Sequence, residues 1–236
     1  PAHLLTTDTI DGKVTTVNNS PIIAHEQGQW CAFPDLDERK QYTGPYQPGN
    51  LDIFADLLQT NGMAEMGKKF LMASGKLQTL AYKAEIERNL RTKDYAGFQL
   101  LGLNDYSGQG SAMVGLLNVF WREKGYCDAT MFRQFCSPLV PLARFPRFVF
   151  TQEDTLRVEV EAYNAGRSDL VTAEASYLIE DSEGKTMASG CFDVSRVSLG
   201  KNNLLGAVTT TLSTFPTPGK YCLKVSVKGT DLEQEQ

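Results

Sequence analysis

Ser20-Pro-Ile-Ile-Ala-His-Glu-Gln-Gly-Gln29 is the stretch that decides the fold of this chain. Pro21 begins an extended segment, Ile22 and Ile23 have the apolar, β-branched side chains of a buried strand, and Glu26 falls where that strand ends. In a (β/α)8 barrel, catalytic side chains project from the C-terminal ends of the strands. A carboxylate in that position can act as a nucleophile or stabilise a positively charged transition state. The alternative is a solvated glutamate that opens a loop.

A second segment with the same character follows downstream. Tyr95–Leu103 is a buried-strand candidate that runs directly into the polar loop Asn104-Asp-Tyr-Ser-Gly-Gln-Gly110. Between the two strand candidates lie an aromatic and proline-containing loop and a helical stretch over 63–89, in which apolar residues recur at spacings of three and four. This βαβ order predicts parallel strands whose polar loops meet at one edge.

Residues 111–150 are predicted to be helical and extended in turn. Short helices are expected over 113–121 and 128–135. The proline-rich run 137–146 is expected to lie extended across a surface and to connect two domains. Residues 1–19, which lack a sustained apolar pattern, are expected to form a loop.

From Thr155 onward the apolar residues alternate with polar ones. Leu156, Val158, Val160 and Ala162 share one face, and an acidic, solvated face is expected opposite them at Glu159, Glu161 and Glu174. Further strands are expected over 173–179, 185–194, 203–212 and 221–227. Strands at this spacing are typical of an immunoglobulin-like β-sandwich. The fold class is therefore α/β followed by all-β, divided into domains 1–150 and 151–236.

The charge distribution bears on the choice of partner. The net charge of −5 comes entirely from residues 151–236, where 13 acidic residues outnumber 8 basic ones. No basic stripe is present to neutralise phosphates, so nucleic acid is not an expected partner. No apolar run of about 20 residues is present either, so no membrane span is expected.

The five cysteines and two histidines show no metal-ligand spacing, so no metal site is predicted. Cys191 and Cys222 lie in strand-like segments, where they could form a disulfide or remain buried free thiols.

Residues 20–150 resemble the C-terminal part of the barrel of glycoside hydrolase family 2, which includes β-galactosidases, β-glucuronidases and β-mannosidases. The resemblance is carried by Pro21-Ile-Ile-Ala-His-Glu26, by Ala96-Gly-Phe-Gln-Leu-Leu-Gly-Leu-Asn-Asp105 and by Phe135-Cys-Ser-Pro-Leu-Val-Pro-Leu142. It implies the last strands of a (β/α)8 barrel followed by a sandwich, without a cofactor, in a bacterial protein of the periplasm or the exterior.

The resemblance also implies roles for individual residues. Glu26 would be the nucleophile of a retaining β-glycosidase that acts on terminal β-linked sugars of glycans. His25, Gln29 and Trp30 would bind the carbohydrate, with Trp30 stacking on a sugar ring. Asn104 and Asp105 are expected to hydrogen-bond the substrate, although Asp105 is equally suited to capping its own loop.

The family's acid/base follows an asparagine, and this chain contains no Asn-Glu dipeptide. The chain is therefore expected to be an inactive C-terminal fragment whose partners are the missing N-terminal barrel and sandwich domains, with homo-oligomerisation through exposed barrel edges as a further expectation. The alternative is a non-catalytic carbohydrate-binding or structural sandwich module, or a protein-interaction sandwich unrelated to sugar.

Overall fold

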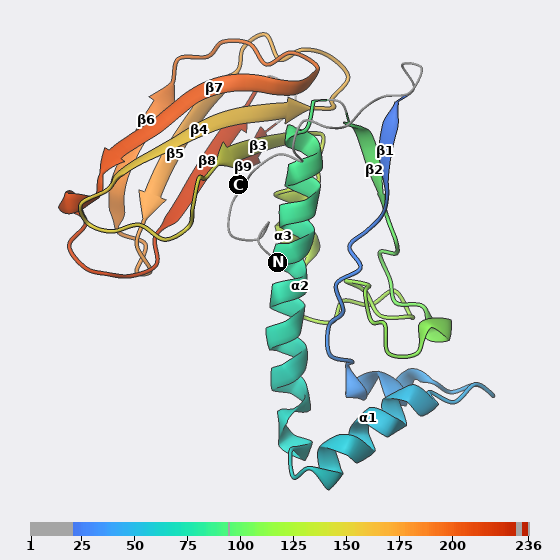
Figure 1. The fold of residues 1–236 in the computed structure, drawn as a ribbon. Helices are drawn as coiled ribbons and strands as arrows, with labels where there is room; N and C mark the ends of the chain where they lie inside the picture. Colours follow the sequence, from blue (N-terminus) through green and yellow to red (C-terminus); the bar gives the residue numbers. More distant parts are fainter. Residues whose placement is uncertain (1–20, 94, 230–232, 236) are drawn as a thin grey trace. The chain divides into compact units, whose positions relative to one another are not determined.

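The computed structural model describes residues 21–93, 95–229 and 233–235 (Figure 1). Its contacts divide the chain into two compact units. The first, called here the helical unit, comprises Ile23–Glu85 and Gly97–Phe132. The second, called the sheet unit, comprises the described residues of 86–96 and 133–235, together with residues 21–22. The loop expected over residues 1–19 lies outside the described residues.

The helical unit contains a pair of strands joined through two helices. Its main elements are β1 (Ile22–Gln27), α1 (Gly49–Thr60), α2 (Gly67–Arg91), whose last turns belong to the sheet unit, and β2 (Tyr95–Leu100), with the 3-10 helices η2 (Leu36–Gln41), η3 (Ala64–Met66) and η4 (Ser107–Gln109). β1 and β2 lie side by side in one sheet (Figure 1). The Leu101 N–H donates to the Gln27 carbonyl at 2.9 Å, which joins the C-terminal ends of the two strands. The strands are therefore parallel, as the βαβ order predicts.

The prediction that these strands are buried is wrong. Ile22 is half-buried and Ile23 is 57% exposed, and the residues of β2 are half-buried or exposed. In the part of the chain that the structure describes, this sheet contains β1 and β2 alone. A two-stranded sheet leaves its outer edges and much of its faces uncovered, so apolar side chains stay at the surface.

Helix α2 confirms the helix predicted over 63–89, and its predicted apolar face is buried in part: Leu71, Ala81 and Ile86 are at most 1% exposed. Leu77 and Leu80 are 56% and 60% exposed, whereas Gln78 and Tyr82 are fully buried. The buried face therefore includes an amide and a hydroxyl, which need hydrogen-bond partners that apolar periodicity does not reveal. None of the helices in the described residues, α2 included, is long and apolar enough to cross a bilayer.

The helix predicted over 113–121 is absent from the structure. Leu117 instead forms isolated β-bridges with Asn104 and Glu123, and its N–H donates to the Leu103 carbonyl at 3.0 Å. The backbone is irregular here because its polar groups bond to distant segments. The helix expected over 128–135 is confirmed as α3 (Ala129–Arg133).

The sheet unit contains two antiparallel sheets, with strand orders β3-β4-β7 and β6-β5-β8-β9. The strands are β3 (Leu139–Arg144), β4 (Thr155–Asn164), β5 (Glu174–Glu180), β6 (Thr186–Phe192), β7 (Gly200–Thr211), β8 (Cys222–Lys228) and β9 (Glu233–Glu235). The five segments predicted from the alternation after Thr155 are confirmed as β4 to β8. Their immunoglobulin-like topology stays a prediction.

The apolar face of β4 is confirmed, and its acidic face is confirmed only in part. Leu156, Val158, Val160 and Ala162 are at most 7% exposed and share one core with residues of both sheets. The expectation that Glu161 is solvated is wrong: it is 5% exposed, and Arg144 of the neighbouring strand donates to its carboxylate at 2.8 Å.

The proline-rich run 137–146 is not a surface connector. Its central residues form β3, in which Leu139, Val140 and Leu142 are buried and Pro141 lies opposite Ala162. β3 is at the edge of its sheet, where proline is tolerated because one side of the backbone has no ladder partner. The sheet thus takes in a strand that precedes residue 151, while the domain division at residue 150 stays a prediction.

Cys191 and Cys222 are free thiols, and both are exposed rather than buried. β6 and β8 flank β5 on opposite sides, with Cys191 opposite Ser176 and Cys222 opposite Glu180. The strand order therefore separates the two sulfur atoms and precludes the disulfide.

Candidate functional site

Glu26 lies one residue before the end of β1 in a left-handed backbone conformation, with φ of 51°. Such a conformation costs a non-glycine residue about 1 kcal/mol or more. Neighbouring side chains of a regular strand point to opposite faces. The backbone turn at Glu26 instead leaves the His25 Nε2 atom 3.6 Å from Glu26 Oε1. The Glu26 side chain is 48% exposed and can therefore meet a ligand from solvent.

Polar groups from two further positions contact this carboxylate or its neighbour His25. The Gln29 amide nitrogen donates to Glu26 Oε2 at 3.3 Å, and Gln99 of β2 accepts from His25 Nδ1 at 2.6 Å. With Nδ1 as that donor, His25 Nε2 carries a proton only in the imidazolium form, whose charge would then face Glu26. His25, Glu26, Gln29 and Gln99 are called here the Glu26 cluster. A carboxylate oriented by an amide and an imidazole has the chemistry of a nucleophile or of an electrostatic stabiliser.

The loop that follows Glu26 is fixed by Glu85 of α2. The Glu85 carboxylate accepts the Gly28 backbone N–H at 3.0 Å and the Trp30 indole N–H at 2.7 Å. Gly28 has φ of 82°, and a Cβ there would lie 2.0 Å from the Tyr82 ring, so only glycine fits. Glu85 therefore sets the path of the chain from the strand end to the half-buried Trp30.

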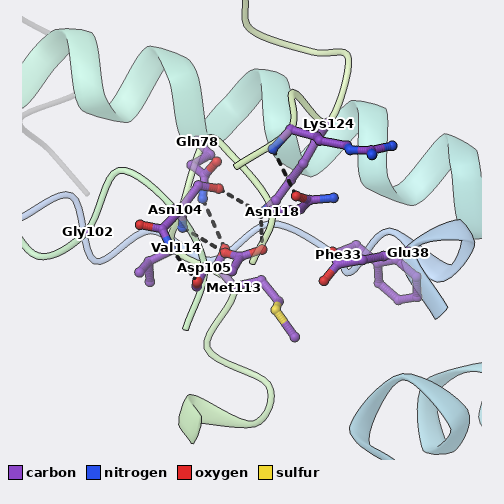
Figure 2. A network of polar contacts seen from close by, with 12 residues as sticks. Phe33, Glu38, Gln78, Gly102, Asn104, Asp105, Met113, Val114, Asn118 and Lys124 are labelled. Carbon is purple, nitrogen blue, oxygen red and sulfur yellow. Dashed lines mark hydrogen bonds and ion pairs between the residues drawn. The ribbon is translucent and has the colours of Figure 1, made fainter. Parts of the chain in front are cut away.

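A buried amide on α2 ties this loop to the segment after β2 (Figure 2). Gln78 Nε2 donates to the Trp30 carbonyl at 2.6 Å and to the Met113 carbonyl at 3.1 Å. Gln78 Oε1 accepts from the Tyr126 hydroxyl at 2.6 Å. The Tyr126 ring lies against Gly75, where a Cβ would be 2.2 Å from it. Close packing of ring and helix thus puts Tyr126 within reach of Gln78.

Asp105 and Lys124 form a buried ion pair in the same network (Figure 2). The residues are 2% and 3% exposed, and Lys124 Nζ lies 2.5 Å from Asp105 Oδ2. Gly115 donates its N–H to Asp105 at 2.9 Å and accepts from Lys124 at 2.7 Å. Burial raises the pKa of the Asp105 carboxyl, and the Lys124 ammonium opposes that rise. Asn104 is half-buried, and its amide donates to the Asp105 carbonyl at 2.9 Å.

Glu38 of η2 is a second buried carboxyl in the helical unit. It is 4% exposed and accepts from the Tyr42 hydroxyl at 3.2 Å. Burial raises the pKa of Glu38, the Tyr42 hydrogen bond lowers it, and the charge of Asp105 raises it further. The Lys124 ammonium lowers the pKa of Glu38, so the two charges of the buried pair act on this carboxyl in opposite directions.

The structure places the predicted site residues in two sets. His25, Glu26 and Gln29 lie in the Glu26 cluster, whereas the Trp30 backbone and Asp105 belong to the network around Gln78 and Lys124. Within the described residues, no hydrogen bond or ion pair joins Glu26 directly to Asn104 or Asp105.

Sequence reasoning missed Glu85, Gln78, Lys124 and Glu38. Gln78 and Glu85 are seven residues apart on α2, with Tyr82 between them, so the three share one helix face. Because α2 carries many other charged and polar residues, this spacing did not distinguish Gln78 and Glu85 in the sequence. Lys124 and Glu38 give no signal either, because their partners come from distant segments.

A family model described as "Domain of unknown function (DUF8488)" matches residues 154–235. No curated protein matches the chain. Among solved structures, it is similar to the exo-chitosanase CsxA of Amycolatopsis orientalis at 16% identity and a TM-score of 0.46, over 96% of this chain and 31% of that one.

A second similarity is to the β-glucuronidase of Parabacteroides merdae, at 19% identity and a TM-score of 0.27, over 35% of this chain and 10% of that one. The chain thus spans less than a third of the length of either structure.

Proposed function

We propose that this chain is part of a retaining β-glycosidase related to glycoside hydrolase family 2, with Glu26 as the nucleophile. One observation carries the proposal: an exposed carboxylate stands in a left-handed turn at the C-terminal end of a parallel strand. Its neighbours Gln29 and His25 supply an amide donor and an imidazole. In the reaction, a Glu26 oxygen bonds to the anomeric carbon as the bond to the leaving-group oxygen breaks, and water then hydrolyses the glycosyl ester.

The other residues of the site are proposed to bind and orient the substrate. His25 and Gln29 lie beside the attacking oxygens, Trp30 offers a ring for stacking on a pyranose, and Asn104 offers an amide in the segment that follows β2. For Asp105 we propose the positioning role, since its carboxylate is engaged by Lys124 and Gly115.

The proposal requires a second carboxyl about 5–5.5 Å from Glu26 that protonates the leaving group. We propose that it comes from a part of the protein outside the printed sequence, and that the substrate is a terminal β-linked sugar. This chemistry needs no metal or organic cofactor.

The intact protein that contains this chain provides the test. It is treated with a 2-deoxy-2-fluoro-glycosyl fluoride, digested and mapped by mass spectrometry, and the label is expected on Glu26. Glu26→Gln should lower turnover about a thousandfold or more. The matched control is Glu65→Gln, which changes an exposed glutamate of η3 and should leave turnover intact.

A label on another peptide, or a Glu26→Gln variant with full turnover, would remove the assignment. Sugar binding by an intact protein that neither turns over nor takes up the label would favour the non-catalytic carbohydrate-binding module.

A further inference from the structure

The sheet unit contains a pocket of about 450 Å³ that the proposed glycosidase chemistry does not use. It lies between the segment 145–152, which joins β3 to β4, and the segment 212–221, which joins β7 to β8. Leu156, Ile179 and Leu223 of the strands complete the lining. The volume is within the range of about 300–1,000 Å³ that is typical of small-molecule sites.

The walls of this pocket are aromatic. The Phe145 and Phe148 rings have centroids 5.5 Å apart with a tilt of 36°, and Phe215 and Tyr221 meet edge to face at 4.8 Å. Phe150 completes the aromatic lining. Phe148 is 53% exposed, so it presents apolar ring surface that the described residues leave uncovered.

The polar groups of the lining are few, and some are already engaged. The Tyr221 hydroxyl donates to the Thr217 carbonyl at 2.6 Å, and the Gln152 amide donates to the Ser213 carbonyl at 3.4 Å. Among the described residues that line the pocket, Lys220 is the single charged side chain. The Lys220 cation beside an aromatic pocket is complementary to a ligand with an apolar body and an anionic end.

We propose that this pocket binds a small amphipathic anion, namely a carboxylate attached to an aromatic ring or a short hydrocarbon chain. The apolar body lies among Phe145, Phe148 and Phe150, and the carboxylate meets the ammonium of Lys220. A sugar fits less well, because its hydroxyl groups need several free donors and acceptors that this lining does not offer. The inference is independent of the function proposed for Glu26.

Isothermal titration of the 236-residue chain with 4-phenylbutyrate tests the proposal. We expect saturable one-to-one binding with a dissociation constant of about a millimolar. Phe148→Ala should weaken it about fivefold. Lys220→Gln should weaken binding of 4-phenylbutyrate but leave that of the neutral 4-phenylbutyramide unchanged.

Matched controls change exposed residues of the same unit outside the pocket. Leu204→Ala removes a 68% exposed apolar side chain from β7, and Lys185→Gln removes an exposed cation; neither should alter the affinity. Thermal unfolding of each variant verifies that it is folded.

Four results would overturn the proposal. The first is absence of saturable binding, and the second is an affinity for 4-phenylbutyrate in the Phe148→Ala and Lys220→Gln variants that equals that of wild type. The third is tighter binding of methyl β-glucoside than of 4-phenylbutyrate, and the fourth is a dimer of the chain that Phe148→Ala dissociates. The last would identify a second copy of the chain as the occupant.

Discussion

Glu26 occupies a backbone conformation that glycine adopts more readily, since its φ is 51°. We predict that Glu26→Gly raises the free energy of unfolding by about 0.5–1 kcal/mol while abolishing the labelling of the intact protein. Urea denaturation measures the first effect. Gly62→Ala is the control: its φ of 67° and open surroundings should make it destabilising by about 1 kcal/mol. A similar loss in both variants would show that Glu26 is not strained.

Because Asp105 and Lys124 are both buried, we expect the loss of stability from changing one of them to depend on whether the other is still charged. Asp105→Asn leaves the ammonium without its counter-charge and should cost about 3–5 kcal/mol in urea denaturation. The double variant Asp105→Leu with Lys124→Met should cost less than either single change, since it removes both charges. Asp37→Asn, at an exposed pair with Lys40, should cost under about 1 kcal/mol. Additive losses at the buried pair would contradict this coupling.

At the scale of elements, α2 holds the loop after β1 through the two hydrogen bonds of Glu85. Glu85→Gln should break one of them, because an amide has a single acceptor atom. We expect a loss of about 1.5–3 kcal/mol and a red shift of Trp30 fluorescence, measured in a Trp121→Phe background. Glu65→Gln should change neither quantity. Unchanged Trp30 emission in Glu85→Gln would mean that the loop is held in another way.

The C-terminal end of α2 is covered by the start of β7. Lys201 Nζ donates to the carbonyls of Asn89 at 2.7 Å and Thr92 at 3.0 Å, and Asn202 donates to the Arg91 carbonyl at 3.0 Å. The carbonyls of Asn89 and Thr92 also accept backbone N–H groups at 3.2 Å, so the Lys201 side chain of β7 adds a second hydrogen bond to each.

Burial lowers the pKa of Lys201 to about 8, from an ordinary value of 10.5. Between these pH values the unfolded chain binds this proton more than the folded chain does, so the free energy of unfolding rises with pH. We predict that wild type gains stability relative to Lys201→Met as urea titrations move from pH 8 to pH 10.5. Comparing the two proteins cancels the contribution of tyrosines. A constant difference across that range would contradict the prediction.

At the scale of the whole molecule, apolar side chains of the helical unit remain exposed, among them Ile23 at 57% and Leu80 at 60%. Exposed apolar residues beside an open strand edge favour association. We predict that the 236-residue chain self-associates in sedimentation velocity, and that Ile23→Lys weakens this association about tenfold. Leu204→Lys, on β7, is the control. A strict monomer at every concentration would exclude association through the strand pair.

The strands β4 to β8 could be predicted from the sequence because alternation directly records which face of a strand is buried. The position of Glu26 at the end of β1 was predictable for a similar reason, since a strand and its end are local features. The prediction of a helix over 113–121 is wrong because the backbone groups of this segment bond to Leu103 and other distant residues instead of to each other.

What the sequence determined by itself is the pattern of apolar periods and the order of the elements. Tertiary structure alone decided that Gln78 and Lys124 are buried and that Glu85 accepts a hydrogen bond from Trp30. It also decided that a proline-containing run forms the edge strand β3. The physical reason is the same in each case. A polar side chain or a proline is acceptable in a folded interior only if its surroundings satisfy it, and those surroundings come from segments far away in the chain.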